Sequence, residues 1–110
     1  GWDEDTLSFF FHLVKGVEDN KEELDKVLSK ASQEWPLYRM ANVDRNILRL
    51  AVFEILFLPQ VPISVAINEA VELGKKYGTE DSGKFINGVL GQLVKNLEEK
   101  ENYLPKREEL

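Results

Sequence analysis

The fold is decided by residues 35–93, which read WPLYRMANVDRNILRLAVFEILFLPQVPISVAINEAVELGKKYGTEDSGKFINGVLGQL. Apolar residues recur along this stretch at intervals of three and four, the spacing of one face of an α-helix. It has no Val/Ile/Thr-rich alternation of the kind that marks a strand. We therefore predict an all-α protein, a compact helical bundle of about five helices.

Three of the predicted helices begin inside this stretch. The first spans residues 42–58 and is apolar on nearly all sides, which is typical of a central helix. Pro59 ends it, and Pro62 can occupy the first turn of the next helix, residues 63–77. The last helix begins after Thr79, runs to Leu97 and has the most regular apolar stripe of the chain.

Two further helices are predicted before Trp35-Pro36, which breaks the helical pattern. One covers residues 20–33, and a short turn follows it over residues 37–40. The other covers residues 5–16. Its core-facing stripe is predicted to be Leu7, Phe10, Phe11 and Val14.

The length of 110 residues supports one domain, which we place at residues 1–97, followed by a polar C-terminal tail at residues 98–110. No apolar run approaches the roughly 20 residues that a spanning helix needs, and no signal-peptide pattern is present. The absence of cysteine excludes disulfides and thiolate metal sites. We expect a cytoplasmic protein without membrane contact.

The net charge of −6 argues against a general nucleic-acid binder, because Lys and Arg provide most of the affinity for phosphates. The charge is unevenly spread, however. Residues 1–34 hold nine acids and four bases (−5), and residues 98–110 hold five acids and three bases (−2). Residues 35–97 hold six acids and seven bases (+1), so the central block can still present a local basic surface.

Groups suited to catalysis are scarce. His12 is the only histidine, and it is better explained as a residue at the edge of the core or at an interface than as a base. Glu69 and Glu72 could share a helical face, but a carboxylate pair alone is weak support for a transition metal. Glu54 lies among apolar residues, and a structural pairing is the better explanation. We predict no catalytic residue, no metal and no cofactor.

The glycines form neither of the common phosphate-binding loops. Gly88 and Gly91 interrupt the last helix, at a cost of about 1 kcal/mol each relative to alanine. We predict that they let another backbone approach closely.

The start of the last helix combines features of nucleic-acid sites. Helix N-termini offer amide donors to phosphate, Ser82 adds a hydroxyl, Lys84 a positive charge, and Phe85 a ring on which an unstacked base can lie. Asp81 opposes phosphate. From the residues alone, ordinary capping with Phe85 in the core is the favoured interpretation.

A second cluster consists of Arg39, Arg45 and Arg49, and the last two share a helical face. These arginines could bind a partner. The alternative is that they cap helices or pair with Glu54 and Asp44 inside the fold.

Three runs carry a likeness to a known family, namely VDRNILRL at residues 43–50, AINEAVEL at 66–73 and DSGKFINGVL at 81–90. With them the chain resembles the NusB family of bacterial transcription antitermination factors. The resemblance implies a NusB-like fold and an RNA- and protein-binding adaptor, not an enzyme, that promotes ribosomal RNA transcription. Its partners would be boxA-type single-stranded RNA, the small ribosomal subunit protein NusE and, indirectly, the transcription elongation complex.

The resemblance also implies which residues carry these contacts. The partner NusE would meet Asp44 and Arg45 at the start of the third long helix. The RNA-binding residues would be Thr79, Asp81, Ser82, Lys84, Phe85 and Arg49.

The front of the chain departs from the family pattern, because the expected arginine-rich arm and two helices are missing. We expect an N-terminal truncation that exposes Phe9, Phe10 and Phe11, or self-association into a homodimer that covers them. Two other functions stay open. One is the NusB-like accessory domain of a ribosomal RNA cytosine methyltransferase, and the other is a structural helical module without RNA contact.

Overall fold

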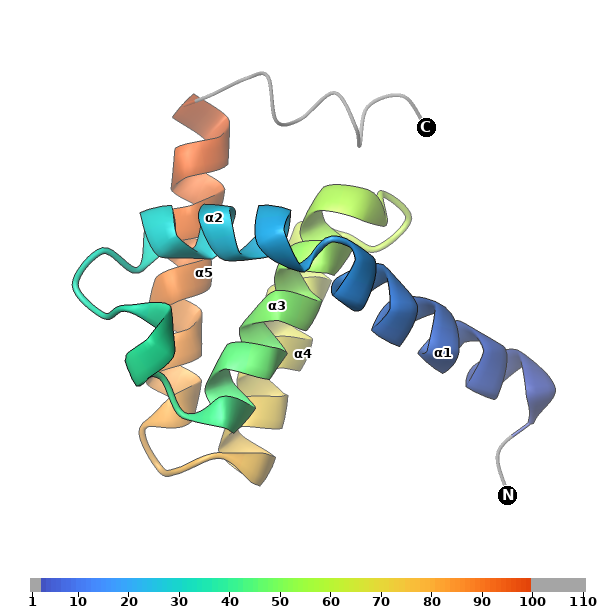
Figure 1. The fold of residues 1–110 in the computed structure, drawn as a ribbon. Coiled ribbons are helices and arrows are strands. Elements are labelled where there is room, and N and C mark those ends of the chain that lie inside the picture. Colours follow the sequence, from blue (N-terminus) through green and yellow to red (C-terminus); the bar gives the residue numbers. More distant parts are fainter. Residues whose placement is uncertain (1–2, 100–110) are drawn as a thin grey trace.

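The computed structural model describes residues 3–99, and every regular element within them is helical. In chain order these are α1 (Glu4–Asp19), α2 (Lys21–Ala31), the short 3-10 helix η1 (Leu37–Arg39), α3 (Asn42–Phe57), α4 (Ile63–Tyr77) and α5 (Ser82–Glu99) (Figure 1). The predicted all-α fold of about five helices is confirmed. Of the predicted polar tail, residues 98 and 99 continue α5, and the rest lies outside the described residues.

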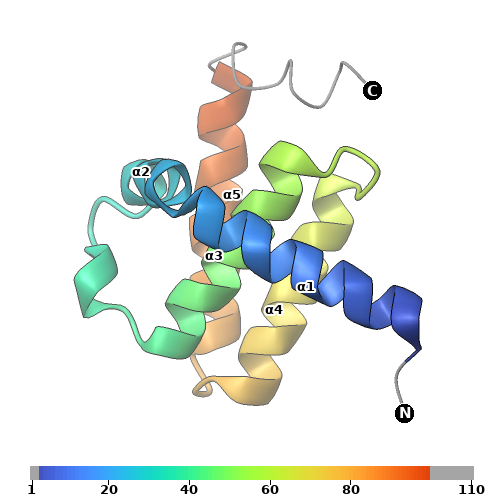
Figure 2. The same ribbon diagram turned by 45° about the vertical axis from the view of Figure 1, so that its right-hand side comes forward.

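Helix α3 lies at the centre, as its apolar sequence predicts. It packs against each of the other four long helices, and α2 crosses over α5 toward α3 (Figure 1). Six residues of α3 are buried, and they are Leu48, Ala51, Val52, Phe53, Ile55 and Leu56. Figures 1 and 2 both place α4 and α5 along α3 as the rest of the core.

Small residues set how closely the helices approach one another. A Cβ atom on Gly74 of α4 would lie 2.6 Å from Cδ1 of the buried Ile86 of α5, so any other residue here would force the Ile86 side chain to move. The prediction for Gly88 and Gly91 was wrong. A Cβ atom at either position would meet nothing within 4 Å, because both glycines are on the exposed side of α5.

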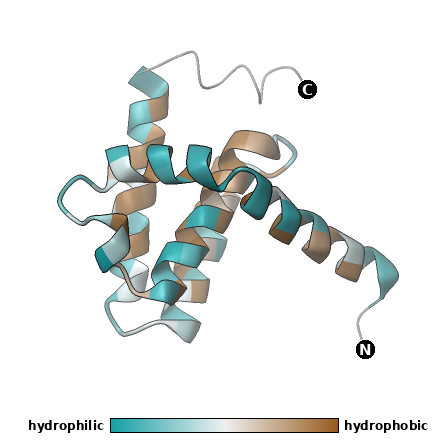
Figure 3. Cartoon of the chain, viewed as in Figure 1, coloured by the Kyte–Doolittle hydropathy of each residue, from teal (hydrophilic) through white to brown (hydrophobic). Residues whose placement is uncertain are grey.

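Helix α1 is the least covered element, and its N-terminal half extends beyond the other helices (Figure 1). None of its residues is buried. The predicted core-facing stripe was wrong, because α1 instead turns Leu13 and Val17 to the core. The members of that stripe are exposed, and Phe9, Phe10 and Phe11 are exposed as predicted. In Figure 3 the ribbon of this projecting helix carries several segments coloured brown for hydrophobic residues.

Candidate nucleic-acid interface

The N-terminal tip of α5 is built by a reciprocal cap. The Ser82 hydroxyl accepts a hydrogen bond from the Thr79 amide at 2.9 Å, and Thr79 Oγ1 accepts one from the Asp81 amide at 3.3 Å. This arrangement is a variant of the capping box, in which side chains satisfy amides that a helix start leaves open. Thr79, Glu80 and Asp81 are exposed around it. The tip is therefore an open and internally braced surface.

The cap changes the role expected of Ser82. Only 1% of this residue is exposed, so its hydroxyl holds the turn and does not reach the molecular surface. The Ser82 amide is also used, because it donates to the Thr79 carbonyl at 3.1 Å. The amides of Thr79, Asp81 and Ser82 are thus occupied by the turn itself and are not open to a phosphate.

Lys84 and Phe85 follow the cap and present a cation beside an aromatic ring. Lys84 is exposed. Phe85 is partly buried against the core and partly accessible. It therefore contributes to core packing and also forms part of the molecular surface. A base can stack on such a ring.

Trp35 extends this aromatic surface and was not among the predicted site residues. Its ring meets Phe85 edge to face, with centroids 6.5 Å apart and planes at 70°. The Arg39 guanidinium lies 5.3 Å from the Trp35 centroid, a cation–π distance. Trp35 is 45% exposed. The sequence indicated only that Trp35 precedes a helix-breaking proline, and it gave no sign of a contact with Phe85.

A groove of about 1030 Å³ opens beside this aromatic pair. One wall is the C-terminal end of α2 with residues 32–35, and the other is α5. Lys30, Lys84 and Gly88 are among the lining residues, together with Trp35 and Phe85. The groove therefore adjoins the tip of α5 and shares Lys84 and Phe85 with it.

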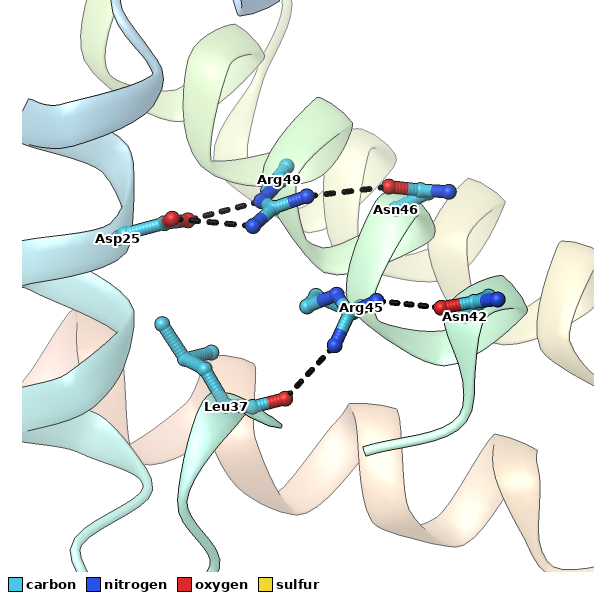
Figure 4. A network of polar contacts seen from close by, with 6 residues as sticks. All are labelled: Asp25, Leu37, Asn42, Arg45, Asn46 and Arg49. Carbon is cyan, nitrogen blue, oxygen red and sulfur yellow. Dashed lines mark hydrogen bonds and ion pairs between the residues drawn. The ribbon is translucent and has the colours of Figure 1, made fainter. Parts of the chain in front are cut away.

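Arg49 lies elsewhere and joins α3 to α2 (Figure 4). Its Nε donates to Asp25 Oδ1 at 2.8 Å, its Nη2 donates to Asp25 Oδ2 at 3.0 Å, and its Nη1 donates to Asn46 Oδ1 at 3.3 Å. The side chain is only 13% exposed. The sequence offered Glu54 and Asp44 as possible partners of the arginines inside the fold, whereas the partner of Arg49 in the structure is Asp25. This commits the guanidinium to the fold and leaves little of it for RNA.

Arg45 also has an internal role, at the start of α3 (Figure 4). Its Nη1 donates to the Leu37 carbonyl of η1 at 3.0 Å, and its Nη2 donates to the Asn42 side chain. These bonds fix η1, and with it the segment after Trp35, against α3. The neighbouring Asp44 is partly buried, and its Oδ1 has no hydrogen-bond donor among the described residues.

Groups suited to catalysis are not gathered at this surface. His12 is exposed on α1. Within residues 3–99 no three His, Asp or Glu side chains are placed to hold a metal ion.

Burial raises the pKa of Glu54 to about 7, and the negative charge of Glu69 on α4 adds to this shift. The protonated form is favoured because a half-buried carboxylate loses hydration. In the described part of the chain no helix is long and apolar enough to cross a membrane.

Together these features define an all-α binding domain whose open surface combines aromatic rings with charged side chains of both signs. The NusB family profile matches residues 2–95, so the chain belongs to the NusB family. Proteins named "Transcription antitermination protein NusB" include those of Desulforudis audaxviator, 49% identical over 96% of this chain and 74% of that protein, and Desulfosudis oleivorans, 50% identical over 93% and 66%. That of Pelotomaculum thermopropionicum is 54% identical over 79% of this chain and 60% of its own length.

Two solved structures share the fold. The T. maritima NusB structure superposes with a TM-score of 0.81 at 41% identity, covering 86% of this chain and 66% of that one. A chain in "Crystal Structure of a Plectonemic RNA Supercoil" gives 0.80 at 34% identity, covering 87% and 70%. The chain thus spans about two-thirds of these relatives. Their name denotes a non-enzymatic role, in agreement with the sequence prediction that the protein is not an enzyme.

Proposed function

We propose that this chain acts as an RNA- and protein-binding adaptor in bacterial transcription antitermination, in the cytoplasm, and that it promotes ribosomal RNA transcription. The RNA is boxA-type and single-stranded, and it lands on the N-terminal tip of α5. The partner protein is NusE, which links the adaptor to the transcription elongation complex.

One observation carries the RNA part of the proposal. Phe85 is partly accessible and meets the ring of Trp35 edge to face, and the exposed Lys84 precedes it in the first turn of α5. Single-stranded RNA is recognised through unstacked bases on aromatic rings combined with cations for the phosphates. The presence of a related chain in a crystal structure of RNA agrees with this function. Thr79 and Asp81 form the rim of the same site, whereas Ser82 braces it from inside.

The start of α3 supports the protein part. Asp44 is in the first turn of α3, with one carboxylate oxygen that has no donor among residues 3–99. This oxygen is itself buried, whereas Asp44 as a whole is partly exposed. An acidic residue at this position is suited to a charge-assisted bond with a basic partner. Arg45 supports this surface through its bonds to η1 and Asn42.

The experiment is a titration of a labelled boxA-type RNA with this chain, alone and with NusE, at several salt concentrations. We expect the Kd to rise with salt because phosphate contacts release counterions. Phe85→Leu should weaken binding by about tenfold, since one stacked base contributes about 1–3 kcal/mol, while the apolar leucine retains most of the core packing. A scrambled RNA is the control for sequence, and thermal denaturation of the variant is the control for folding.

Two results would contradict the proposal. One is equal affinity of Phe85→Leu and the unchanged chain, which would place the RNA elsewhere. The other is the absence of both RNA and NusE binding under conditions in which a full-length NusB relative binds both.

A second copy of the chain is a further proposed partner. Exposed apolar residues gather on α1, among them Phe10 and Phe11, whose rings meet edge to face at 5.6 Å. Exposed apolar residues that gather on one face mark interaction surfaces. Self-association into a homodimer would cover them.

A further inference from the structure

The groove beside α5 contains a helical glycine that the fold does not require. A Cβ atom added to Gly88 would meet no atom within 4 Å, although the residue lies inside an 18-residue helix. Glycine costs about 1 kcal/mol relative to alanine at such a position. At Gly74 the same cost is explained by contact with α5, whereas at Gly88 no contact within the described chain explains it.

The walls of the groove have the chemistry of a nucleotide site. The rings of Trp35 and Phe85 line it, and the Arg39 guanidinium lies on Trp35. Lys30 and Lys84 add positive charge from opposite walls. Aromatic faces with adjacent cations are what single-stranded nucleic acids bind.

Two amide side chains continue the groove along α5. Gln92 donates from Nε2 to Asn96 Oδ1 at 2.8 Å, and both residues line the groove. This bond uses one hydrogen of the Gln92 amide and leaves its carbonyl and the Asn96 NH₂ for other partners. Amides of this kind can bond to base edges. Two acids, Glu34 and Glu99, also line the groove and favour a base over a phosphate in their vicinity.

We propose that this groove is a second nucleotide subsite, which receives an unstacked base of the same single-stranded RNA, and that Gly88 leaves the room for that base. This inference rests on the proposed RNA function and deepens it. Continuity selects RNA as the occupant, because Lys84 and Phe85 belong both to the tip and to the groove. A strand that lands on the tip can therefore continue into the groove without leaving the protein surface.

Gly91 provides a matched control. It lies in the same helix, its added Cβ atom would also meet nothing within 4 Å, and it is not among the residues that line the groove. Glutamine at either position adds a neutral side chain with good helix propensity. Gly88→Gln and Gly91→Gln should therefore raise the Tm alike, and only the first should fill the groove.

The test measures the affinity of both variants for a boxA-type RNA of about 12 nucleotides, a length within the range that one small domain covers. We expect Gly88→Gln to raise the Kd by about tenfold, as expected for the loss of one base contact, and Gly91→Gln to leave it within about twofold. A second readout uses 2-aminopurine in the RNA. Its fluorescence should be quenched by stacking at one position, and this quenching should be lost in Gly88→Gln and in Trp35→Leu.

The outcomes separate the two proposals. If the unchanged chain binds no RNA, both fall. If Phe85→Leu weakens binding while Gly88→Gln and Gly91→Gln give the same Kd, the tip is retained and the subsite is overturned. If Gly88→Gln weakens the binding of NusE but not of RNA, the groove belongs to a protein and the subsite is again overturned.

Discussion

Arg49 and Asp25 form a two-pronged ion pair that joins α3 to α2, with Nε 2.8 Å from Oδ1 and Nη2 3.0 Å from Oδ2. Planar pairing of this kind gives directional bonds that a lysine cannot reproduce. The pair therefore fixes how α2 crosses the central helix, and it turns an arginine that the family resemblance assigned to RNA into part of the fold.

We expect this pair to contribute measurably to stability. Asp25→Asn and Arg49→Lys should each lower the free energy of unfolding by about 1–3 kcal/mol, because each leaves a poorly hydrated partner behind. A double-mutant cycle by denaturant unfolding should show coupling. The exposed pair of Lys15 and Asp19, 3.4 Å apart, is the control and should give at most about 0.5 kcal/mol. Equal coupling in the two pairs would contradict the structural role of Arg49.

Glycine substitutions should have opposite effects at two positions. Gly16→Ala places a Cβ atom 2.2 Å from Cζ of Phe53, whose rigid ring is buried in the core, so we expect destabilisation by about 1–3 kcal/mol. Gly91→Ala meets open space and should stabilise the protein by up to about 1 kcal/mol. Thermal denaturation measures both variants, and we expect a lower Tm for Gly16→Ala and a higher Tm for Gly91→Ala. A stabilised Gly16→Ala would show that α1 does not rest on α3 as described.

The carboxyl group of Glu54 should make stability depend on pH. Its pKa is raised to about 7 in the folded state from an ordinary value of 4.5, so the folded protein holds this proton longer than the unfolded chain does. Stability from this group is fully present below about pH 4.5 and is lost as the pH rises to about 7.

Glu54→Gln should flatten this pH dependence and raise the free energy of unfolding at pH 8 by an amount on the order of 1 kcal/mol after solvent screening. Urea unfolding at pH 5, 6, 7 and 8 is the measurement. Glu69→Gln removes the smaller cause and should shift the midpoint of the pH dependence downward. An unchanged pH profile in Glu54→Gln would assign the titration to another group.

Asp81→Asn should strengthen RNA binding. The carboxylate is exposed at the proposed phosphate site, whereas the cap uses the backbone amide of this residue and not its side chain. Removal of one unfavourable charge contact of about 1 kcal/mol lowers the Kd by about fivefold, and added salt should diminish the gain. Glu18→Gln, an exposed acid on α1, is the control for net charge. The same gain in both variants would mean that the overall charge, and not this site, is responsible.

The apolar face of α1 should drive self-association. Phe11 is 63% exposed, and burial of such a ring contributes about 2 kcal/mol, so Phe11→Ser should weaken dimerisation by at least about tenfold. Sedimentation velocity over a concentration series measures this. Val65→Ser, which removes an exposed apolar side chain from α4, should leave the dimer unchanged. A monomer at all concentrations of the unchanged chain would refute the proposal.

Sequence periodicity was sufficient for the order of the helices and, with the prolines, for the bounds of α3 and α4. It was wrong for the end of α1, which continues past Gly16 to Asp19, and α2 ends at Ala31 and not at residue 33. Periodicity was also sufficient to identify α3 as the central helix. Periodicity could not indicate which apolar face finds a partner. The stripe on α1 has core spacing, yet Phe10 and Phe11 remain exposed because no described element lies over them.

The candidate site was only partly predictable for a related reason. The cluster after Thr79 is local, so its cap could be anticipated from residue types. The ion pair of Arg49 with Asp25 spans 24 positions, and the contact of Trp35 with Phe85 joins two separate segments. Such pairings depend on how the helices cross, and this information is not present in the spacing of either segment.

The reciprocal bonds between Thr79 and Ser82 imply preorganisation of the α5 tip. Because the turn already pairs the amides of Thr79, Asp81 and Ser82, it has little conformational freedom left to lose when a ligand arrives. Encounter with a strand should then require ordering of the nucleic acid alone, so association can proceed without a slow rearrangement of the protein.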